Sequence, residues 1–163
     1  MENMEIERKF LVDHLPEGLE TFPCHRIEQA YLCTSPVVRV RQEDETYYLT
    51  YKGGGLKCRE EYNLPLNAQA YAHLSAKADG NILTKRRYMI PVGTYTAELD
   101  IFEEAYLGLR YVEVEFDSEA EADAFTPPAW FGAELTGQGE YQNSALSRAE
   151  SPARWLALHG FKA

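Results

Sequence analysis

The stretch Met4-Glu5-Ile6-Glu7-Arg8-Lys9-Phe10 alternates between charged and apolar residues over most of its length. Side chains two residues apart point to the same face of a strand, so Glu5, Glu7 and Lys9 share one face. In an ordinary half-buried strand these charges would face bulk water, which is the simplest interpretation of one strand taken alone. The stretch therefore predicts a β-strand with one charged face.

The same alternation recurs along the chain, in seven predicted strands altogether. In Val38-Arg39-Val40-Arg41, for example, two arginines share a face opposite two valines. If every charged face met bulk water, like charges would repel one another within each stripe without a compensating contact. We therefore predict that these faces point inward, with seven acids opposite seven bases. The predicted interior charges are Glu5, Glu7, Glu61, Glu98, Asp100, Glu113 and Glu115, and Lys9, Arg39, Arg41, Lys52, Arg59, Lys85 and Arg87.

Eight predicted strands account for most of the chain. Turn residues separate them, as in Glu43-Asp44-Glu45 and Pro91-Val92-Gly93, which favours antiparallel neighbours. An antiparallel sheet of this size can remove its edges by closing on itself. The expected fold class is therefore α+β and mainly β, a closed eight-stranded antiparallel β-barrel with flanking helices. We predict strands over 3–12, 26–33, 36–43, 46–53, 57–65, 82–91, 95–102 and 109–117.

Helix signals occur in three segments outside the strands. Asn67 is a candidate N-cap, and Ser118 forms a capping box with Glu121. We predict helices over 67–77, over 118–125, and in one or two pieces from Tyr141 onward, with a break at Ser151-Pro152. Because no linker or repeat interrupts the 163 residues, we expect a single domain over 1–163.

Composition restricts the class of protein. The chain is 45% hydrophobic and 26% charged, which argues against intrinsic disorder, and it has no apolar run of about 18 residues. Its formal net charge of -10 would repel nucleic acid and anionic membranes. Cys24, Cys33 and Cys58 lack metal-type spacing and indicate free thiols in a reducing compartment. We expect a cytoplasmic protein without nucleic-acid or membrane partners, and whether it forms a homodimer is left open.

A charged barrel interior has a chemical consequence. Desolvated charges are costly unless they are paired and hydrogen-bonded, so water and a ligand are expected inside. Clustered arginine and lysine suit a polyanion. The carboxylates would repel that anion unless a hard divalent cation, Mg²⁺ or Mn²⁺, bridges them to its phosphate oxygens. We therefore predict metal-dependent binding and cleavage of a linear polyphosphate.

Taken in chain order, the charged motifs resemble those of the CYTH family, the triphosphate tunnel metalloenzymes. The segment Glu5-Ile6-Glu7-Arg8-Lys9 is similar to the family's E-x-E-x-K signature. The resemblance implies one barrel with a charged tunnel that hydrolyses inorganic triphosphate, thiamine triphosphate or RNA 5′-triphosphate ends, or converts ATP to cyclic AMP. The short bacterial branch, in which tripolyphosphatase activity is common, is the most similar. Six further motifs follow in the family's order: Arg39-x-Arg41, Thr50-x-Lys52, Arg59-x-Glu61, Lys85-x-Arg87, Glu98-x-Asp100 and Glu113-x-Glu115.

The resemblance also implies a role for each matching position. The expected metal ligands are Glu5, Glu7 and Glu115. The expected catalytic residues are Glu113, Asp100 and Glu61. The expected substrate-binding residues are Lys9, Arg39, Arg41, Lys52, Arg59, Lys85 and Arg87. The chain departs from the family at Tyr141-Gln142-Asn143, because bacterial relatives often have lysine in the middle position. The neutral Gln142 removes one candidate phosphate contact.

Three classes of function fit these motifs. The leading one is a metal-dependent hydrolase that converts inorganic triphosphate to diphosphate plus phosphate. A class IV type adenylate cyclase or a thiamine triphosphatase on the same fold is the first alternative. A non-catalytic polyphosphate-binding module is the second, although an anion binder gains nothing from opposing carboxylates. Other features predict no site: His14, His25, His73 and His159 lack metal spacing, and Gly53-Gly54-Gly55 lacks the ending of a P-loop.

Overall fold

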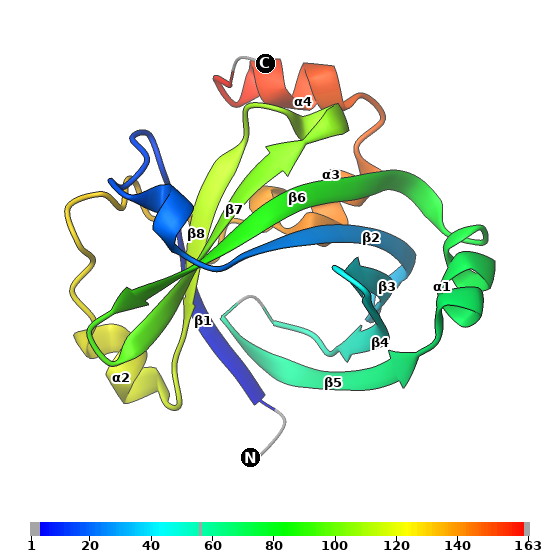
Figure 1. The fold of residues 1–163 in the computed structure, drawn as a ribbon, viewed down its shortest axis with the longest axis horizontal. Helices are drawn as coiled ribbons and strands as arrows, with labels where there is room; N and C mark the ends of the chain where they lie inside the picture. Colours follow the sequence, from blue (N-terminus) through cyan, green and yellow to red (C-terminus); the bar gives the residue numbers. More distant parts are fainter. Residues whose placement is uncertain (1–3, 56, 162–163) are drawn as a thin grey trace.

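Each alternating segment of the sequence forms one strand of a closed antiparallel barrel (Figure 1), as predicted. The structure is a computed structural model that describes residues 4–55 and 57–161. Around the barrel the strand order is β1-β5-β4-β3-β2-β6-β7-β8, and β8 closes onto β1. The strands are β1 (Met4–Leu11), β2 (Cys24–Thr34), β3 (Val37–Glu43), β4 (Thr46–Lys52), β5 (Cys58–Leu66), β6 (Asp79–Val92), β7 (Tyr95–Glu103) and β8 (Arg110–Glu115).

β1 closes the barrel by pairing with two different strands. Its N-terminal end pairs with β5, and the rest of it pairs with β8. Residues directly opposite each other in antiparallel strands have their side chains on the same face. The register sets Glu7 opposite Glu115 and Lys9 opposite Glu113. All four side chains therefore face the same side of the sheet, which is the barrel interior.

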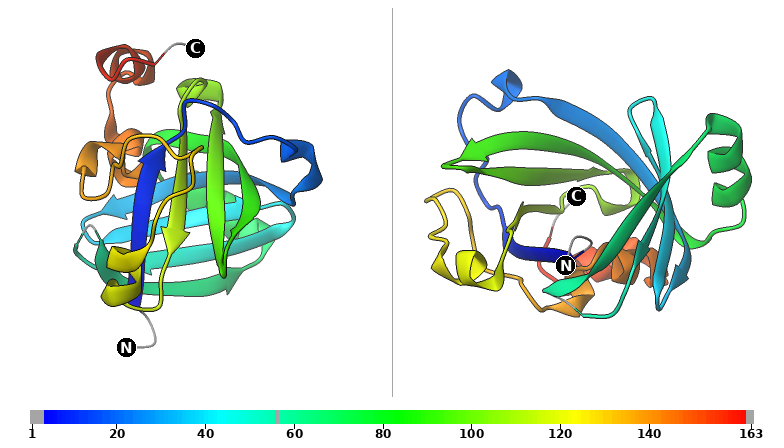
Figure 2. Two further views of the ribbon diagram at one scale, coloured as in Figure 1. Left: turned by 90° about the vertical axis from the view of Figure 1, so that its left-hand side faces the viewer. Right: turned by 90° about the horizontal axis from the view of Figure 1, so that it is seen from below.

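The helices lie outside the barrel, and α1 and α2 flank opposite sides of it (Figures 1 and 2). Within the described residues, none of the helices has the length and apolar character needed to cross a membrane. The α-helices are α1 (Ala68–Ser75), α2 (Glu119–Ala124), α3 (Asn143–Arg148) and α4 (Pro152–Leu158). Short 3-10 helices occur at Leu19–Thr21, Glu104–Tyr106 and Gly139–Tyr141.

Local capping explains where the helices begin. The Asn67 side chain accepts a hydrogen bond from the backbone of Ala70 at 2.7 Å, and Ser118 accepts one from the backbone of Glu121 at 3.1 Å. Ser151 caps α4 in the same way, which confirms the predicted break in the C-terminal tail. The helix predicted over 67–77 is longer than α1, which ends at Ser75, shortly before β6 begins at Asp79.

The apolar core packs on the outer faces of the strands. One buried cluster surrounds Val112 and packs against α2 and the aromatic residues near it. A second includes Phe102 and Leu146, so that it joins β7 to α3. A third places Tyr71 of α1 over Val40 of β3. Because the helices cover the outward apolar faces, the charged faces are left to line the interior.

Candidate functional site

The barrel interior is a charged cavity of about 410 Å³. Twelve of the fourteen charges predicted to point inward line it, together with Glu43, so the inward orientation of those twelve is confirmed. The cationic lining residues are Lys9, Arg39, Arg41, Lys52, Arg59 and Arg87. The acidic lining residues are Glu5, Glu7, Glu43, Glu61, Glu98, Glu113 and Glu115.

Five carboxylates gather on one side of this cavity, which we call the acidic wall: Glu5, Glu7, Glu98, Glu113 and Glu115. They come from β1, β7 and β8, which are neighbours in the barrel. The register sets Glu7 opposite Glu115, and Glu98 opposite Glu113. Like charges that lie directly opposite in adjacent strands destabilise a sheet. The acidic wall therefore favours a bound cation.

The proton affinities of the acidic wall reflect this crowding. Burial, followed by the charges of Glu113 and Glu5, raises the pKa of Glu7 well above its ordinary value. Glu115 lies at the exposed rim, where partial desolvation and three nearby carboxylates raise its pKa to about 7. Burial acts against ionisation of Glu113 too, but Lys9 and further hydrogen-bonding and charged neighbours lower the pKa of Glu113. The raised pKa values of Glu7 and Glu115 show that a neighbouring cation would favour the ionised form of both.

Four cations of the cavity lining form a second group, which we call the basic wall: Arg39, Arg41, Lys52 and Arg87. β3, which contributes two of them, lies across the barrel from β8. Arg39 is buried, and its Nε atom has no hydrogen-bond partner among the described residues. Leaving such a donor unsatisfied costs about 1–3 kcal/mol. Burial and the charges of Arg39 and Arg87 lower the pKa of Arg41. An anion bound among these groups would give Arg39 Nε an acceptor and would offset the positive charges that lower the pKa of Arg41.

Ion pairs already connect the two walls. Lys52 Nζ donates to both oxygens of Glu5, at 2.9 and 3.0 Å, and lies 3.2 Å from Glu61. Arg59 approaches Glu5 at 3.6 Å, and Arg87 donates to Glu98 at 3.4 Å. A ligand that bridges the walls would therefore replace contacts that the protein makes within itself.

The expected metal ligands fit a hard divalent cation in their chemistry. Glu5, Glu7 and Glu115 supply the carboxylate oxygens that such ions prefer, and they belong to adjacent strands of the acidic wall. Within the described ranges, no three histidine, cysteine, aspartate or glutamate side chains are already gathered as a metal cluster. Part of the reason is that Glu5 is turned toward Lys52. A cation would have to draw the carboxylates together.

Two of the predicted site residues lie behind the cavity wall. Lys85 and Asp100 are fully buried, and their Nζ and Oδ2 atoms are 2.6 Å apart. Asp100 also accepts hydrogen bonds from Nε and Nη2 of Arg87, at 2.7 and 2.9 Å. Neither residue lines the cavity, so Lys85, which was expected to bind the substrate, and Asp100, which was expected to be catalytic, both lie behind it in this arrangement. Asp100 instead holds Arg87 in its orientation within the basic wall.

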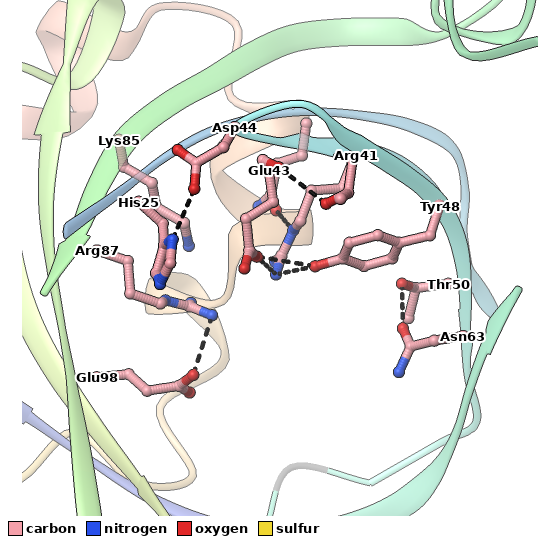
Figure 3. Close-up of polar contacts among 12 residues, drawn as sticks. His25, Arg41, Glu43, Asp44, Tyr48, Thr50, Asn63, Lys85, Arg87 and Glu98 are labelled. Atoms are coloured by element: carbon pink, nitrogen blue, oxygen red, sulfur yellow. Dashed lines mark hydrogen bonds and ion pairs between the residues drawn. The ribbon is translucent and has the colours of Figure 1, made fainter. Parts of the chain in front are cut away.

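Sequence reasoning missed several polar residues that complete the cavity. Figure 3 shows Arg41, Tyr48 and Glu43 together on one side of the interior, with Arg87 and Glu98 on another. The Tyr48 hydroxyl donates to Glu43 at 3.0 Å and accepts from Arg41 Nη1 at 3.3 Å. These residues share the interior face by alternation, but their contacts depend on which strands are neighbours.

Residues 135–138 and 142–144 also line the cavity, and they include Gln142 and Asn143. Gln142 is half-buried there, which places the departure from the family motif at the cavity. Asn143 reaches the buried residues Gln29, Lys85 and Tyr111 through its side-chain amide. No alternation marks this segment, so only the expected family motif pointed to it.

Among the described residues, the histidines and cysteines take part in no metal-type cluster. Cys24, Cys33 and Cys58 are free thiols, as predicted. His25 Nδ1 lies 2.6 Å from Asp44 Oδ2 near the turn between β3 and β4 (Figure 3).

Comparisons with known proteins agree with this geometry. The family model of the CYTH domain matches residues 3–148. An inorganic triphosphatase of Nitrosomonas europaea is 40% identical over 149 residues, which cover 88% of this chain and 96% of the relative. An inorganic triphosphatase of Acetivibrio thermocellus is 32% identical over 146 residues, covering 87% and 92%. A crystal structure of an inorganic triphosphatase, 35% identical, matches with a TM-score of 0.68 over 90% of this chain and 96% of that chain.

Proposed function

Because this chain belongs to the CYTH family, we propose that it is a metal-dependent hydrolase that converts inorganic triphosphate to diphosphate plus phosphate. One observation is central to the proposal: inside the barrel, the acidic wall and the basic wall line a single cavity, with Arg39 and Arg41 of β3 across the barrel from β8. Such an arrangement suits a polyanion and a cation bound together. Two relatives that span most of this chain are inorganic triphosphatases, and triphosphatases of this family are metal-dependent.

The basic wall would bind the substrate. Guanidinium groups can donate two parallel hydrogen bonds to phosphate oxygens, and Arg39 has a buried Nε that needs an acceptor. Arg41 is likewise buried, and Arg87 is held in place by Asp100. Lys9, Lys52 and Arg59 add positive charge near the acidic wall. Triphosphate would thus lie with its length along fixed cations.

Glu5, Glu7 and Glu115 would hold the metal, Mg²⁺ or Mn²⁺. When bound, such an ion supplies charge neutralisation for phosphate oxygens and lowers the pKa of a bound water. For the metal to bind, Glu5 has to leave Lys52, and the raised pKa values of Glu7 and Glu115 have to fall. This requirement couples metal binding to substrate binding, because a phosphate can take over Lys52.

For the reaction, the protein mainly positions groups and stabilises charge. Water attacks the terminal phosphorus in line, the bridging P–O bond breaks, and diphosphate leaves with that oxygen. Glu113 is ionised and has a low pKa, so it would orient the attacking water as a hydrogen-bond acceptor rather than hold its proton. Glu61 would assist from the cavity wall, and Asp100 would act through Arg87. Catalysis of phosphoryl transfer depends mainly on such positioning and on stabilisation of charge.

The alternatives receive no specific support from the cavity. An adenylate cyclase needs an adenine pocket, but Tyr48, an aromatic lining residue, is already engaged by Arg41 and Glu43. A non-catalytic module would not need the acidic wall. We further propose that residues 1–163 act as one domain. A cytoplasmic location, the absence of nucleic-acid partners and the choice between monomer and homodimer stay predictions.

The proposal is tested with the purified protein and either Mg²⁺ or Mn²⁺. Inorganic triphosphate, ATP and thiamine triphosphate are compared, and phosphate, diphosphate and cyclic AMP are scored. We expect the highest kcat/KM for inorganic triphosphate and no cyclic AMP. An equal or higher kcat/KM for ATP or thiamine triphosphate would overturn the substrate assignment. Cyclic AMP as the main product would indicate a cyclase, and tight binding without turnover would indicate a binding module.

A further inference from the structure

The side-chain amide of Asn143, a residue of the cavity lining, is the centre of a hydrogen-bonded network that runs behind the basic wall. Its Oδ1 atom accepts from Gln29 Nε2 at 2.9 Å and from Lys85 Nζ at 3.1 Å. Its Nδ2 atom donates to the hydroxyl of Tyr111 at 2.7 Å. Gln29 continues the network, because its Oε1 atom accepts from Arg41 Nε at 2.8 Å. Two amides in series therefore connect helix α3 to a buried cation of the cavity.

The buried members of this network have few alternative hydrogen-bond partners. Gln29, Lys85 and Tyr111 are fully buried, so a partner lost from them is not replaced by bulk water. Polar groups in such surroundings are worth most when every member is satisfied and are costly when one is missing. Gln29 uses one end of its amide for Asn143 and the other for Arg41. Its orientation is therefore set from both sides.

The orientation of Arg41 is what the network controls. Arg39 and Arg87 face the same cavity, so repulsion favours the displacement of Arg41 away from them. Gln29 holds the Nε atom of Arg41, and Tyr48 accepts from Nη1. The remaining N–H groups of the guanidinium can then point to a ligand from a fixed position.

We propose that Asn143 is a positioning residue, which acts through Gln29 to hold Arg41 for binding of the triphosphate. The proposal rests on the proposed function for the identity of the ligand. It makes a residue of α3, outside the barrel strands, a determinant of substrate affinity.

The chain offers a matched control in β6 that contacts the same helix. Asn81 donates from Nδ2 to the backbone oxygens of Leu146 and Ala149, at 3.0 and 2.8 Å, and so anchors the other end of α3. Asn81 does not line the cavity. Asn81→Ala therefore weakens the attachment of α3 without removing the amide network.

The test uses Asn143→Ala, Gln29→Ala, the double variant and Asn81→Ala. The Kd of inorganic triphosphate is measured by calorimetry without divalent metal, KM and kcat are measured with Mg²⁺, and Tm is followed for each. We expect each single variant of the network to weaken binding on the order of tenfold, the equivalent of one hydrogen bond. The double variant should bind triphosphate no more weakly than the weaker-binding single variant, because Asn143 and Gln29 act on Arg41 in one series. Asn81→Ala should lower Tm and leave Kd unchanged.

Wild-type Kd in Asn143→Ala, additive losses in the double variant, or an equal loss in Asn81→Ala would each overturn the proposal. Gln29→Ala tests the same network from β2 if Asn143→Ala fails to fold. The Kd measurement needs no turnover, so a wild-type protein that binds triphosphate without hydrolysing it would contradict the proposed function alone.

Discussion

The two walls of the cavity differ in how far the protein itself satisfies their charges. In the basic wall, Asp100 holds Arg87, Gln29 holds Arg41, and Glu5 holds Lys52. In the acidic wall, carboxylates lie opposite one another in adjacent strands. Three of the four cations of the basic wall are therefore held before a ligand binds, whereas Glu7 and Glu115 of the acidic wall lie opposite each other and would be stabilised by a cation. This difference predicts that the two walls respond differently to substitution.

The largest effect is expected in the acidic wall. Glu5→Gln, Glu7→Gln and Glu115→Gln should each lower metal-supported kcat about a hundredfold or more, the scale of losing one preorganised charged group. Without metal, Glu7→Gln and Glu115→Gln should melt at the same temperature as wild type or higher, because each relieves carboxylate crowding, whereas Glu5→Gln also removes the ion pair with Lys52 and should melt lower. Glu60→Gln, an exposed residue of β5, is the control and should behave as wild type. Near wild-type turnover for all three at saturating metal would refute the assignment.

The basic wall should respond mainly in binding. Arg39→Ala and Arg41→Ala should raise KM for triphosphate roughly ten- to hundredfold, because a hydrogen bond to a charged group contributes about 1.5–3 kcal/mol. Triphosphate should raise the Tm of the wild type by mass action and raise that of these variants less. Arg86→Ala, an exposed arginine of β6, is the matched control. A KM equal to wild type in both variants would show that these arginines do not bind the substrate.

The acidic wall also predicts how stability depends on pH. The pKa of Glu115 is about 7 in the folded protein, and the pKa of Glu7 is raised as well, so the folded state binds more protons than the unfolded chain. Stability is then greatest below the ordinary glutamate pKa and falls as the pH rises from about 5 through about 7. We expect the metal-free Tm to fall over that range and the profile of Glu115→Gln to be flatter. Identical profiles of Tm against pH in the wild type and Glu115→Gln would contradict the crowding of carboxylates in the acidic wall.

The smallest effect is expected at Gln142, next to the basic wall. Gln142→Lys adds a cation to the cavity lining and should lower KM for triphosphate a few-fold, since an incompletely buried charge contributes roughly 1 kcal/mol or less. Gln69→Lys on the exposed surface of α1 makes the same chemical change away from the cavity and should leave KM unchanged. An unchanged or higher KM in Gln142→Lys would show that this position does not face the bound phosphates.

Alternation in the sequence determined the strands and the direction of most charged side chains. The direction of a side chain in a strand is a local property, because neighbouring residues point to opposite faces. This is why Arg39 and Arg41 could be placed inside the barrel from their spacing alone, and why the caps at Asn67 and Ser118 could be recognised. The same argument indicated a cation site, since Glu5 and Glu7 had to share a face.

Only the tertiary structure decided which of these side chains meet. Closure and register set Gln29 beside Arg41, and they set Lys85 and Asp100 behind the wall that sequence spacing had assigned them to. Asn143 enters the network from a segment without alternation, more than fifty residues beyond Lys85 in the chain. Such contacts depend on how the whole sheet closes and where α3 packs against it. A local pattern contains neither of these, so the partners of each charge were decided by the fold.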